Sequence, residues 1–525
     1  MSTVILRNVS FGYTSPHHDV FEHLDLLIDT NWRAGLVGRN GRGKTTLLKL
    51  IARDLVPQSG EVTHALRTRY FPFRPPDPEV TVFDVVKTAV APFTAWERRM
   101  EALLGAGDDA SLAEYAEVLV RFEAHGGYSI DARITTALAR LELSLLAERL
   151  FSTLSPGERT RALIASLFVG DGSYALIDEP TNHLDLAGRD LLASFLAEQR
   201  GFLLVSHDRA FLDRCIDHVV ALRPRDVAVH RTNYTEFRSI EQARLDLEAR
   251  RSAGLKREIR SLERASHARR EGALARERDK APHVDKGYVG HRAAKQMKRA
   301  IAIERRIERH IAERRTLLRD AEKQRTLGLT PATSRARPLI VANNFSASRS
   351  GRRIFDPVSF SVSAGDRIAI LGPNGSGKST LIEAIRGADT AGEGVLSIAG
   401  GVRIVTALQI PAWREGSLAE HLGEVGLDRV RFFHVMAALG VRGQTLEKPL
   451  ETLSDGERKK IELARTLVTP ADLLVWDEPL NYVDLESREQ LEDLVLDAEP
   501  SLLFVEHDRY FIERVATDVL YVASA

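Results

Sequence analysis

The chain of 525 residues is 44% hydrophobic and 28% charged, which is typical of a folded protein with two or three domains that each bury a full core. Its 73 basic residues balance its 73 acidic residues, and its single cysteine, Cys215, excludes a disulfide framework and a cysteine metal site. The apolar runs are too short to cross a bilayer and residues 1–7 lack the features of a secretory signal, so we expect a cytoplasmic protein without membrane insertion.

Residues 1–237 are predicted to form an α/β domain built around a phosphate-binding loop. Alternating residues 4–11 and the apolar residues 34–37 predict strands, and the second strand leads into a glycine-rich loop and an apolar helix. Glycines let backbone amides close around phosphates, Lys44 reaches the outer phosphates, and Thr45 can ligate Mg²⁺. The predicted ATP-binding residues are Gly38, Arg39, Asn40, Gly41, Arg42, Gly43, Lys44, Thr45 and Thr46.

A buried strand at residues 174–177 is predicted to deliver two carboxylates at its carboxyl end. Asp178 suits a metal shell, and Glu179 suits orienting or deprotonating a water that attacks a phosphate. Two carboxylates at a strand end can also merely cap the next helix, but downstream of a phosphate loop the metal and catalytic interpretation is favoured.

Residues 154–159 place Ser155 at the start of a helix opened by Pro156, which by itself indicates only a helix N-cap. Its position between the phosphate loop and the Asp-Glu strand resembles the signature of the ABC ATPases. Residues 182–185 resemble the D-loop of that family, and residues 205–208 resemble its switch segment. The resemblance implies ATP and Mg²⁺ as ligands, with Ser155 and Gly157 on nucleotide of the opposite domain, Tyr13 on adenine, and Glu179 and His207 as catalytic residues.

Two features of this first half depart from the plain ABC pattern. The family usually has a glutamine near residues 70–73, and the nearest register puts Phe73 there, so we expect the first site to be slower or merely structural. About 35 residues are also inserted between phosphate loop and signature. Residues 96–122 predict two helices, an arm near residues 95–125 that resembles the arm of the ABC-F branch.

A basic segment at residues 238–337 is predicted to be a helical hairpin. Residues 241–325 hold 25 Lys and Arg but 14 Asp and Glu, a net charge of +11. Arg, Lys, Glu, Ala and Leu favour helix, and apolar residues at helical spacing on both sides of Pro282 predict two antiparallel helices with a turn near residues 279–291. Such a segment is either a solvated spacer or a rod that enters a polyphosphate environment such as RNA.

Residues 338–525 repeat the motifs of the first half in the same order. Glu179 and Glu478 are 299 residues apart and His207 and His507 are 300 apart, which indicates a duplicated domain. Arg349 takes the place of Tyr13. The predicted second-site residues are Gly372, Pro373, Asn374, Gly375, Ser376, Gly377, Lys378, Ser379 and Thr380 for ATP, Ser454 and Gly456 for the nucleotide of the first domain, Ser379, Gln409 and Asp477 for metal, and Glu478 and His507 for catalysis.

Two such domains are expected to pair head to tail within a monomer, so that the first site faces residues 454–457 and the second faces residues 155–158. ATP binding would close the pair and hydrolysis would release it. The fold class expected is therefore α/β, with two P-loop ABC ATPase domains joined by a long α-helical hairpin linker.

Tandem ATPase domains and a charged linker resemble the ABC-F family over nearly the whole chain. Residues 476–482 and 285–295 resemble its branch that confers resistance to lincosamides, streptogramin A and pleuromutilins. The resemblance implies ribosome binding, with rRNA, alone or together with tRNA, as partner, and protection of the peptidyl transferase centre. Tyr288 either remodels the antibiotic site or packs the end of the hairpin. The alternatives are the ATPase subunit of a drug exporter and a housekeeping ABC-F translation factor. The predicted ribosome contacts are Lys280, Lys286, Tyr288, His291 and Arg292.

Overall fold

The computed structural model describes residues 2–248, 250–251, 254, 257 and 338–525, apart from residues 15–16, 76, 107, 171, 224–225, 350, 389–390, 410 and 442. The chain divides into two compact units, one made of Met1–Thr235 with Arg325–Ala525 and the other of Glu236–Gln324. Both predicted ATPase domains fall in the first unit. The boundaries that we predicted for the linker, 238 and 337, stay a prediction.

The first half contains a six-stranded sheet in the order β5-β6-β7-β3-β8-β9 and a three-stranded antiparallel sheet in the order β2-β1-β4. Strands β5 to β8 and β3 run parallel, and β9 is antiparallel to β8. The strands are β1 (Thr3–Thr14), β2 (His17–Asp29), β3 (Arg33–Val37), β4 (Ser59–Thr63), β5 (Arg67–Phe71), β6 (Ser173–Asp178), β7 (Phe202–Val205), β8 (His218–Leu222) and β9 (Val227–His230).

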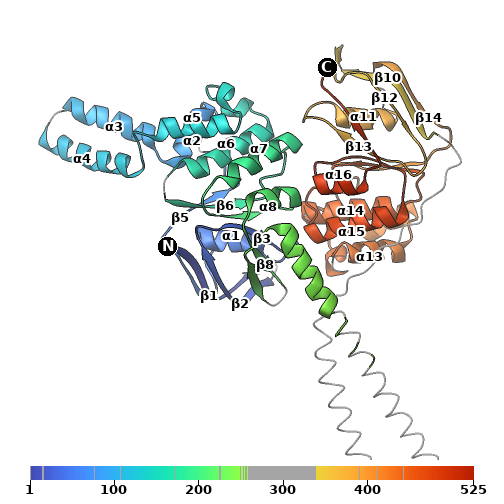
Figure 1. Cartoon of the computed structure of the whole chain (residues 1–525), viewed down its shortest axis with the longest axis horizontal. Coiled ribbons are helices and arrows are strands. Elements are labelled where there is room, and N and C mark those ends of the chain that lie inside the picture. Colours follow the sequence, from blue (N-terminus) through green and yellow to red (C-terminus); the bar gives the residue numbers. More distant parts are fainter. Residues whose placement is uncertain are drawn as a thin grey trace, which may run out of the picture. The chain divides into compact units, whose positions relative to one another are not determined.

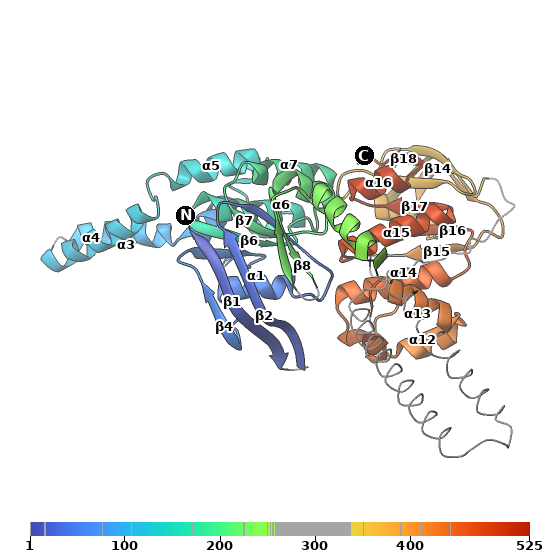
Figure 2. The same ribbon diagram turned by 60° about the horizontal axis from the view of Figure 1, so that its bottom comes forward.

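Helices of the first half cover this sheet, and two of them form the predicted arm (Figure 1). The helices are α1 (Lys44–Ala52), α2 (Val82–Val90), α3 (Phe93–Ala106), α4 (Asp109–Ala124), α5 (Ile130–Arg140), α6 (Pro156–Val169), α7 (Leu186–Ala197) and α8 (Arg209–Cys215), with short 3₁₀ turns at Ser144–Leu146 and Phe151–Thr153. Figures 1 and 2 both show α3 and α4 side by side, extending away from the other helices of this half. The two-helix insertion expected at residues 96–122 is therefore present.

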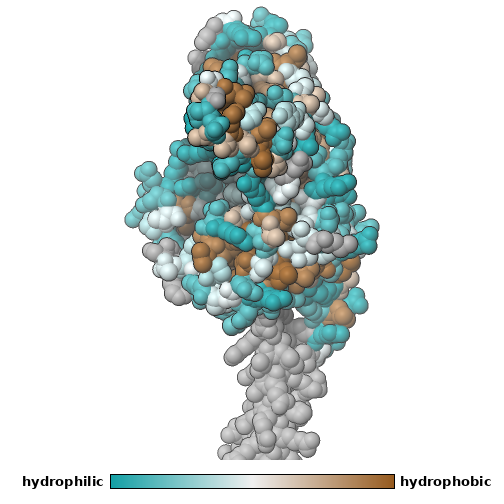
Figure 3. Space-filling model, turned by 90° about the vertical axis from the view of Figure 1, so that its left-hand side faces the viewer, coloured by the Kyte–Doolittle hydropathy of each residue, from teal (hydrophilic) through white to brown (hydrophobic). Residues whose placement is uncertain are grey.

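The arm has a small core and an exposed outer surface. Phe93 packs edge-to-face against Trp96 and Phe122, and Arg99 bonds to Glu114 at 2.7 Å across the two helices. Leu104 and Val120 are exposed. The molecular face in Figure 3 accordingly mixes apolar patches with a mainly hydrophilic surface.

The second half repeats the architecture without the arm. A five-stranded parallel sheet has the order β15-β16-β17-β13-β18, and β10 pairs antiparallel with β11, β12 and β14. The strands are β10 (Ile340–Arg349), β11 (Arg352–Arg353), β12 (Val358–Val362), β13 (Arg367–Leu371), β14 (Gly392–Ile398), β15 (Ile404–Ala407), β16 (Leu473–Asp477), β17 (Leu502–Val505) and β18 (Asp518–Tyr521). The helices are α11 (Lys378–Ile385), α12 (Leu418–Val425), α13 (Arg429–Ala438), α14 (Asp455–Val468), α15 (Leu485–Ala498) and α16 (Arg509–Val515), with 3₁₀ turns at Gly443–Glu447 and Leu450–Thr452.

Buried strands of the second half separate two hydrophobic cores. Successive strand residues point to opposite faces of a sheet. On β16, Leu473 and Val475 join the core beneath α11, whereas Leu474 and Trp476 join the core beneath α13 to α16. Because both faces are covered, the strand reads as a continuous apolar run rather than an alternating one.

Strand pairing shows which residue of the second half corresponds to Phe73, the residue that stands where the family usually has a glutamine. Phe71 pairs with Ile177 and Ala407 pairs with Trp476, each one residue before the Asp-Glu pair of its half. Counting on from these pairs, Phe73 stands at the position of Gln409. The predicted absence of the glutamine from the first half therefore agrees with the strand register.

The beginning of the linker is helical. A helix covers residues 234–248, and Arg244 forms ion pairs with Glu241 and Glu248 along it, as expected for a charged helix. The predicted turn and its proposed ribosome contacts, Lys280, Lys286, Tyr288, His291 and Arg292, lie outside the described residues. Among the residues that are described, no helix is both long and apolar enough to traverse a lipid bilayer.

Candidate functional site

The first phosphate loop connects β3 to α1 and is shaped by glycines. Gly41 and Gly43 have φ angles of 77° and 86°, a left-handed conformation that favours glycine. A Cβ on Gly43 would come within 2.4 Å of Val20. Lys44 begins α1, and its Nζ donates to the carbonyl of Gly38 at 2.8 Å. The ammonium group is thus held inside the loop, where outer phosphates of a nucleotide would meet it.

Asp178, at the carboxyl end of β6, lies beside the phosphate loop. Its Oδ2 accepts hydrogen bonds from Thr45 Oγ1 at 2.7 Å and from the Tyr70 hydroxyl at 3.1 Å. Burial raises the pKa of Asp178 above its ordinary value. A carboxylate and a hydroxyl in contact are the hard oxygen donors that Mg²⁺ prefers, so these residues fit the ion. Bound there, Mg²⁺ would neutralise phosphate charge.

Glu179 is held in an unusual backbone conformation next to the switch histidine. Its φ is 51°, and its N–H donates to the carbonyl of Val205 at 2.8 Å, which fixes the chain at this point. Its Oε1 lies 3.3 Å from His207 Nε2. Burial, together with the charge of Asp178, raises the pKa of Glu179 to about 8, and burial lowers the pKa of His207. A glutamate with a raised pKa is a stronger base once it is ionised, which suits a residue that would take a proton from water.

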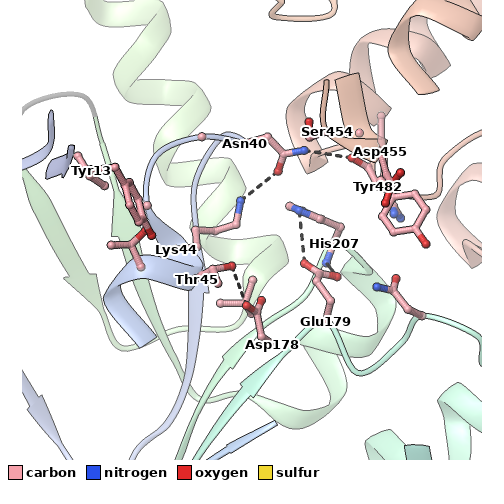
Figure 4. A pocket seen from close by; sticks show the side chains of 18 residues that line it. Tyr13, Asn40, Lys44, Thr45, Asp178, Glu179, His207, Ser454, Asp455 and Tyr482 are labelled. Carbon is pink, nitrogen blue, oxygen red and sulfur yellow. Dashed lines mark hydrogen bonds and ion pairs between the residues drawn. The ribbon is translucent and has the colours of Figure 1, made fainter. Parts of the chain in front are cut away.

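Both halves of the chain contribute to the first site. A pocket of about 530 Å³ holds Lys44, Asp178 and Glu179 together with Ser454 of the second half (Figure 4). Asn40 Nδ2 donates to the carbonyl of Tyr482 at 3.1 Å. The residues that line the pocket are Tyr13, Val20, Asn40, Gly41, Gly43, Lys44, Thr45, Thr46, Asp178, Glu179, Asn182, Val205, His207, Ser454, Asp455, Gly456, Tyr482 and Arg488.

Both signature serines are helix N-caps as well as candidate nucleotide contacts. Ser454 N–H donates to Glu457 at 2.9 Å, and Glu457 N–H donates back to Ser454 Oγ at 3.3 Å. Ser155 and Glu158 form the same capping box on α6. A capping box satisfies two backbone donors at the helix start. The two helices therefore begin in the same way in both halves.

The second site has the same parts in looser contact. Lys378 Nζ donates to the carbonyl of Gly372 at 2.8 Å, and Ser379 Oγ lies 3.2 Å from Asp477 Oδ2. Asp477 Oδ1 is buried and has no hydrogen-bond partner among the described residues, which suits a site that would receive Mg²⁺. Burial and the neighbouring Glu478 raise the pKa of Asp477 to about 6.

The candidate catalytic pair of the second half, Glu478 and His507, repeats the arrangement of the first. Glu478 has a φ of 49°, and its N–H donates to the carbonyl of Val505 at 2.9 Å. His507 Nε2 lies 3.8 Å from Glu478 Oε1, and burial lowers the pKa of His507 to about 3. The lowered pKa keeps the His507 ring neutral at physiological pH.

The second phosphate loop contacts the D-loop of the first half. Asn374 N–H donates to Asp185 Oδ2 at 3.2 Å, and Asn374 Nδ2 donates to the carbonyl of His183 at 3.1 Å. This contact mirrors the one between Asn40 and Tyr482 in the first site. The expectation that Ser155 and Gly157 face Lys378 stays a prediction.

The structure supports the alignment of Arg349 with Tyr13, the proposed adenine contact of the first half. Asn8 and Asn344 have the same rare backbone conformation, with φ of 52° and 46°, and the same offset places Arg349 at the position of Tyr13. Tyr13 is 42% exposed, lines the first pocket, and its hydroxyl lies 3.1 Å from Thr46 Oγ1. An exposed ring at the mouth of the pocket is free to stack on a base.

Sequence reasoning missed one residue of the first site, Arg488, and one contact of a predicted residue, the ion pair of Arg39. Arg488 lines the pocket and donates to Asp508 at 2.9 Å, and Arg39 pairs with Glu486 at 3.1 Å. Arg488 was detectable, because Arg189 stands at the same place after the first D-loop. The partner of Arg39 was not detectable, since it belongs to the other half and the second loop has Pro373 instead.

These folds and sites define an ABC ATPase. The family model described as ABC transporter matches residues 21–182 and 355–481, which together make up more than half of the chain. The chain therefore belongs to this family and hydrolyses ATP.

Relatives that are similar over nearly the full length of the chain indicate the branch of the ABC family to which it belongs. The tylosin resistance ATP-binding protein TlrC of Streptomyces fradiae is 31% identical over 525 residues, which cover 95% of this chain and 94% of TlrC. The energy-dependent translational throttle protein EttA of Escherichia coli is 26% identical, over 96% of this chain and 89% of EttA. A solved archaeal ribosome recycling factor, aABCE1, shares the fold with a TM-score of 0.59 at 19% identity, over 98% of this chain and 87% of aABCE1. With its tandem domains, this chain is an ABC-F ATPase.

Proposed function

We propose that this ATPase binds the ribosome in the cytoplasm and protects the peptidyl transferase centre from antibiotics. The observation that carries the proposal is the similarity to a tylosin resistance protein over 95% of this chain, a match that includes the basic residues 241–325. A net charge of +11 in that segment suits neutralisation of RNA phosphates.

The first site supplies the mechanical part of the proposal. Because its pocket is lined from both halves, bound ATP would bridge Lys44 of the first half and Ser454 of the second. Hydrolysis would remove that bridge, and closure and release of the halves would change the orientation of the linker between them. The protein would act as a monomer, with its two halves paired within the chain.

Trapping the ATP-bound form on ribosomes tests ribosome binding. Glu179→Gln with Glu478→Gln blocks both general bases, so in ATP the double variant should co-sediment with ribosomes. The matched control is Glu198→Gln with Glu499→Gln, because both glutamates are exposed residues at the ends of the equivalent helices α7 and α15. Absence of the trapped variant from the ribosomal pellet would refute the proposal.

Purified translation with a panel of peptidyl transferase inhibitors tests protection. Added protein should restore synthesis for at least one inhibitor, and replacing residues 280–291 by a Gly-Ser turn should abolish that rescue. Synthesis that stays inhibited for every drug would reject protection.

A housekeeping translation factor is the second candidate function, favoured by the similarity to EttA, whose name describes a translational throttle. It predicts ribosome binding by the trapped variant without any change in drug susceptibility. An exporter subunit predicts the reverse, lower drug accumulation in cells and unprotected ribosomes in purified translation.

A further inference from the structure

The first ATP site has to hold its candidate metal ligand without the glutamine that is usual in the family. Phe73 occupies the position of Gln409, and a phenyl ring has no atom that can ligate Mg²⁺ or bind water. The first site nevertheless keeps Lys44, Thr45 and Asp178 in contact geometry. Some other group must therefore fix the carboxylate.

Tyr70 is the group that reaches the carboxylate. It lies on β5, three residues before Phe73, and its hydroxyl donates to Asp178 Oδ2 at 3.1 Å. The same oxygen accepts from Thr45 Oγ1 at 2.7 Å. Two donors on one oxygen restrict the rotation of the carboxylate about its last bond.

Packing fixes the position of the Tyr70 ring. The ring is half-buried against the hydrophobic core that includes Tyr174, Leu176 and Val205. A ring packed in this way offers its hydroxyl in one place, so the hydrogen bond to Asp178 requires little further ordering. The strand pairing of Tyr70 with Leu176, two residues before Asp178, brings the two side chains together.

The second half has no equivalent contact among its described residues. Strand register puts Thr406 at the position of Tyr70. Asp477 Oδ2 accepts from Ser379 at 3.2 Å, and its Oδ1 lacks a partner there. The half that retains Gln409 is thus the half whose aspartate is less restrained.

We propose that Tyr70 is a positioning residue for Mg²⁺ in the first site, orienting Asp178 toward the ion and compensating for the glutamine that Phe73 replaces. Outer hydrogen-bond partners of metal ligands commonly contribute to metal affinity in this way. This role of Tyr70 depends only on Mg²⁺ and nucleotide binding at the first site and is independent of ribosome binding.

The test is the Mg²⁺ dependence of nucleotide binding after Tyr70→Phe. Lys378→Ala provides the background, since it disables the second site. Binding of a fluorescent ATP analogue is titrated with Mg²⁺, and binding of Mn²⁺ with ATP is followed by electron paramagnetic resonance. We expect Tyr70→Phe to raise the Mg²⁺ concentration for half-saturation by about ten- to one-hundredfold, while nucleotide binding in EDTA stays unchanged.

The matched control is Tyr174→Phe, which removes a hydroxyl from the adjacent strand β6. Tyr174 is buried, and its hydroxyl has no hydrogen-bond partner within the described part of the chain. We expect this change to leave the Mg²⁺ titration unaltered. In a Lys44→Ala background, which isolates the second site, Tyr70→Phe should also have no effect.

Two results would overturn the inference. One is a Mg²⁺ titration that Tyr70→Phe shifts by less than about twofold. The other is a loss of nucleotide binding in EDTA that equals the loss in Mg²⁺, because Tyr70 would then support the fold of the site and not the metal ligand.

Discussion

The two ATP sites share a backbone but differ in the side chains around it. In both, the candidate general base, Glu179 or Glu478, has a left-handed conformation and donates its N–H to the last residue of the neighbouring strand. Around this frame, the first site has Tyr70 and Phe73 where the second has Thr406 and Gln409. The backbone at the two Asp-Glu strand ends is therefore the same in both halves, whereas the side chains on the neighbouring strand differ.

Two equivalent arginines, one from each half, also form ion pairs with the opposite half, and these ion pairs differ in burial. Arg209 of the first half is buried against Glu492 and Asp508 of the second and lies 5.2 Å from the ring of Tyr510. Its counterpart, Arg509, reaches Asp190 at 3.4 Å with both side chains largely exposed. One of the two equivalent arginines therefore pairs inside the protein and the other pairs at its surface.

Replacing one candidate general base at a time should give the largest difference between the two sites, measured as the rate of ATP hydrolysis. We expect Glu478→Gln to lower steady-state ATP hydrolysis by roughly 100-fold, since loss of a general base costs about 10²- to 10⁴-fold and the second site keeps Gln409. Glu179→Gln should lower it by less, because the first site is expected to be the slower one. Phosphate release is the measurement. A larger loss for Glu179→Gln would reverse the comparison.

Removing the two equivalent arginines should sharpen the contrast between buried and exposed pairs. Arg209→Ala removes a buried hydrogen-bonded cation from Glu492 and Asp508, which keep Arg514 at 3.0 Å and Arg488 at 2.9 Å, and should cost roughly 2–3 kcal/mol. Arg509→Ala breaks an exposed pair and should cost no more than about 1 kcal/mol. Urea denaturation of both variants gives the comparison, and equal losses would contradict it.

The adenine contact should distinguish the sites by a smaller amount. Tyr13→Ala should weaken ATP binding at the first site by roughly tenfold, since stacking of a base on an aromatic ring is worth about 1–3 kcal/mol. Arg349→Ala should change affinity at the second site less than about twofold. Each variant is measured with the other site disabled by Lys378→Ala or Lys44→Ala. Equal effects would remove this difference between the halves.

The signature caps should show the smallest effect and no difference between halves. Ser155→Ala and Ser454→Ala each remove an N-cap, which costs about 1 kcal/mol. Because α6 and α14 carry the same capping box, the two losses of unfolding free energy should agree. Denaturation curves are the measurement, and a clear inequality would show that one cap has an additional structural role.

Sequence patterns located most of the two sites because their motifs are local. The glycine-rich loops, the Asp-Glu strand ends and the signature caps each combine a strand or helix boundary with nearby polar residues, and local patterns of this kind are readable without a structure. The spacing of the repeats also located the arm. Comparison with the family pattern identified Phe73 as the residue at the glutamine position.

Contacts between residues far apart in the sequence could not be predicted. Arg209 and Glu492 are 283 residues apart, and nothing periodic connects them. The bond from Tyr70 to Asp178 depends on strand order, which places β5 beside β6 although more than 100 residues separate them. The pairing of Arg39 with Glu486 likewise depends on how the halves meet. In each case, tertiary packing chose the partner.

The left-handed backbone of Glu179 and Glu478 limits how the enzyme can change over time. Asparagine, aspartate and glycine adopt this conformation readily, whereas β-branched residues such as valine and isoleucine strain it. A lineage that abandons turnover at one site should therefore arrive at aspartate, asparagine or glycine there, or at glutamine, which has the shape of glutamate, rather than at a β-branched residue. Such a protein would still bind ATP between its halves at that site but would no longer hydrolyse it there. A single-base change in the glutamate codon, such as the one that gives glutamine, is therefore enough to turn a hydrolytic site into one that only binds ATP.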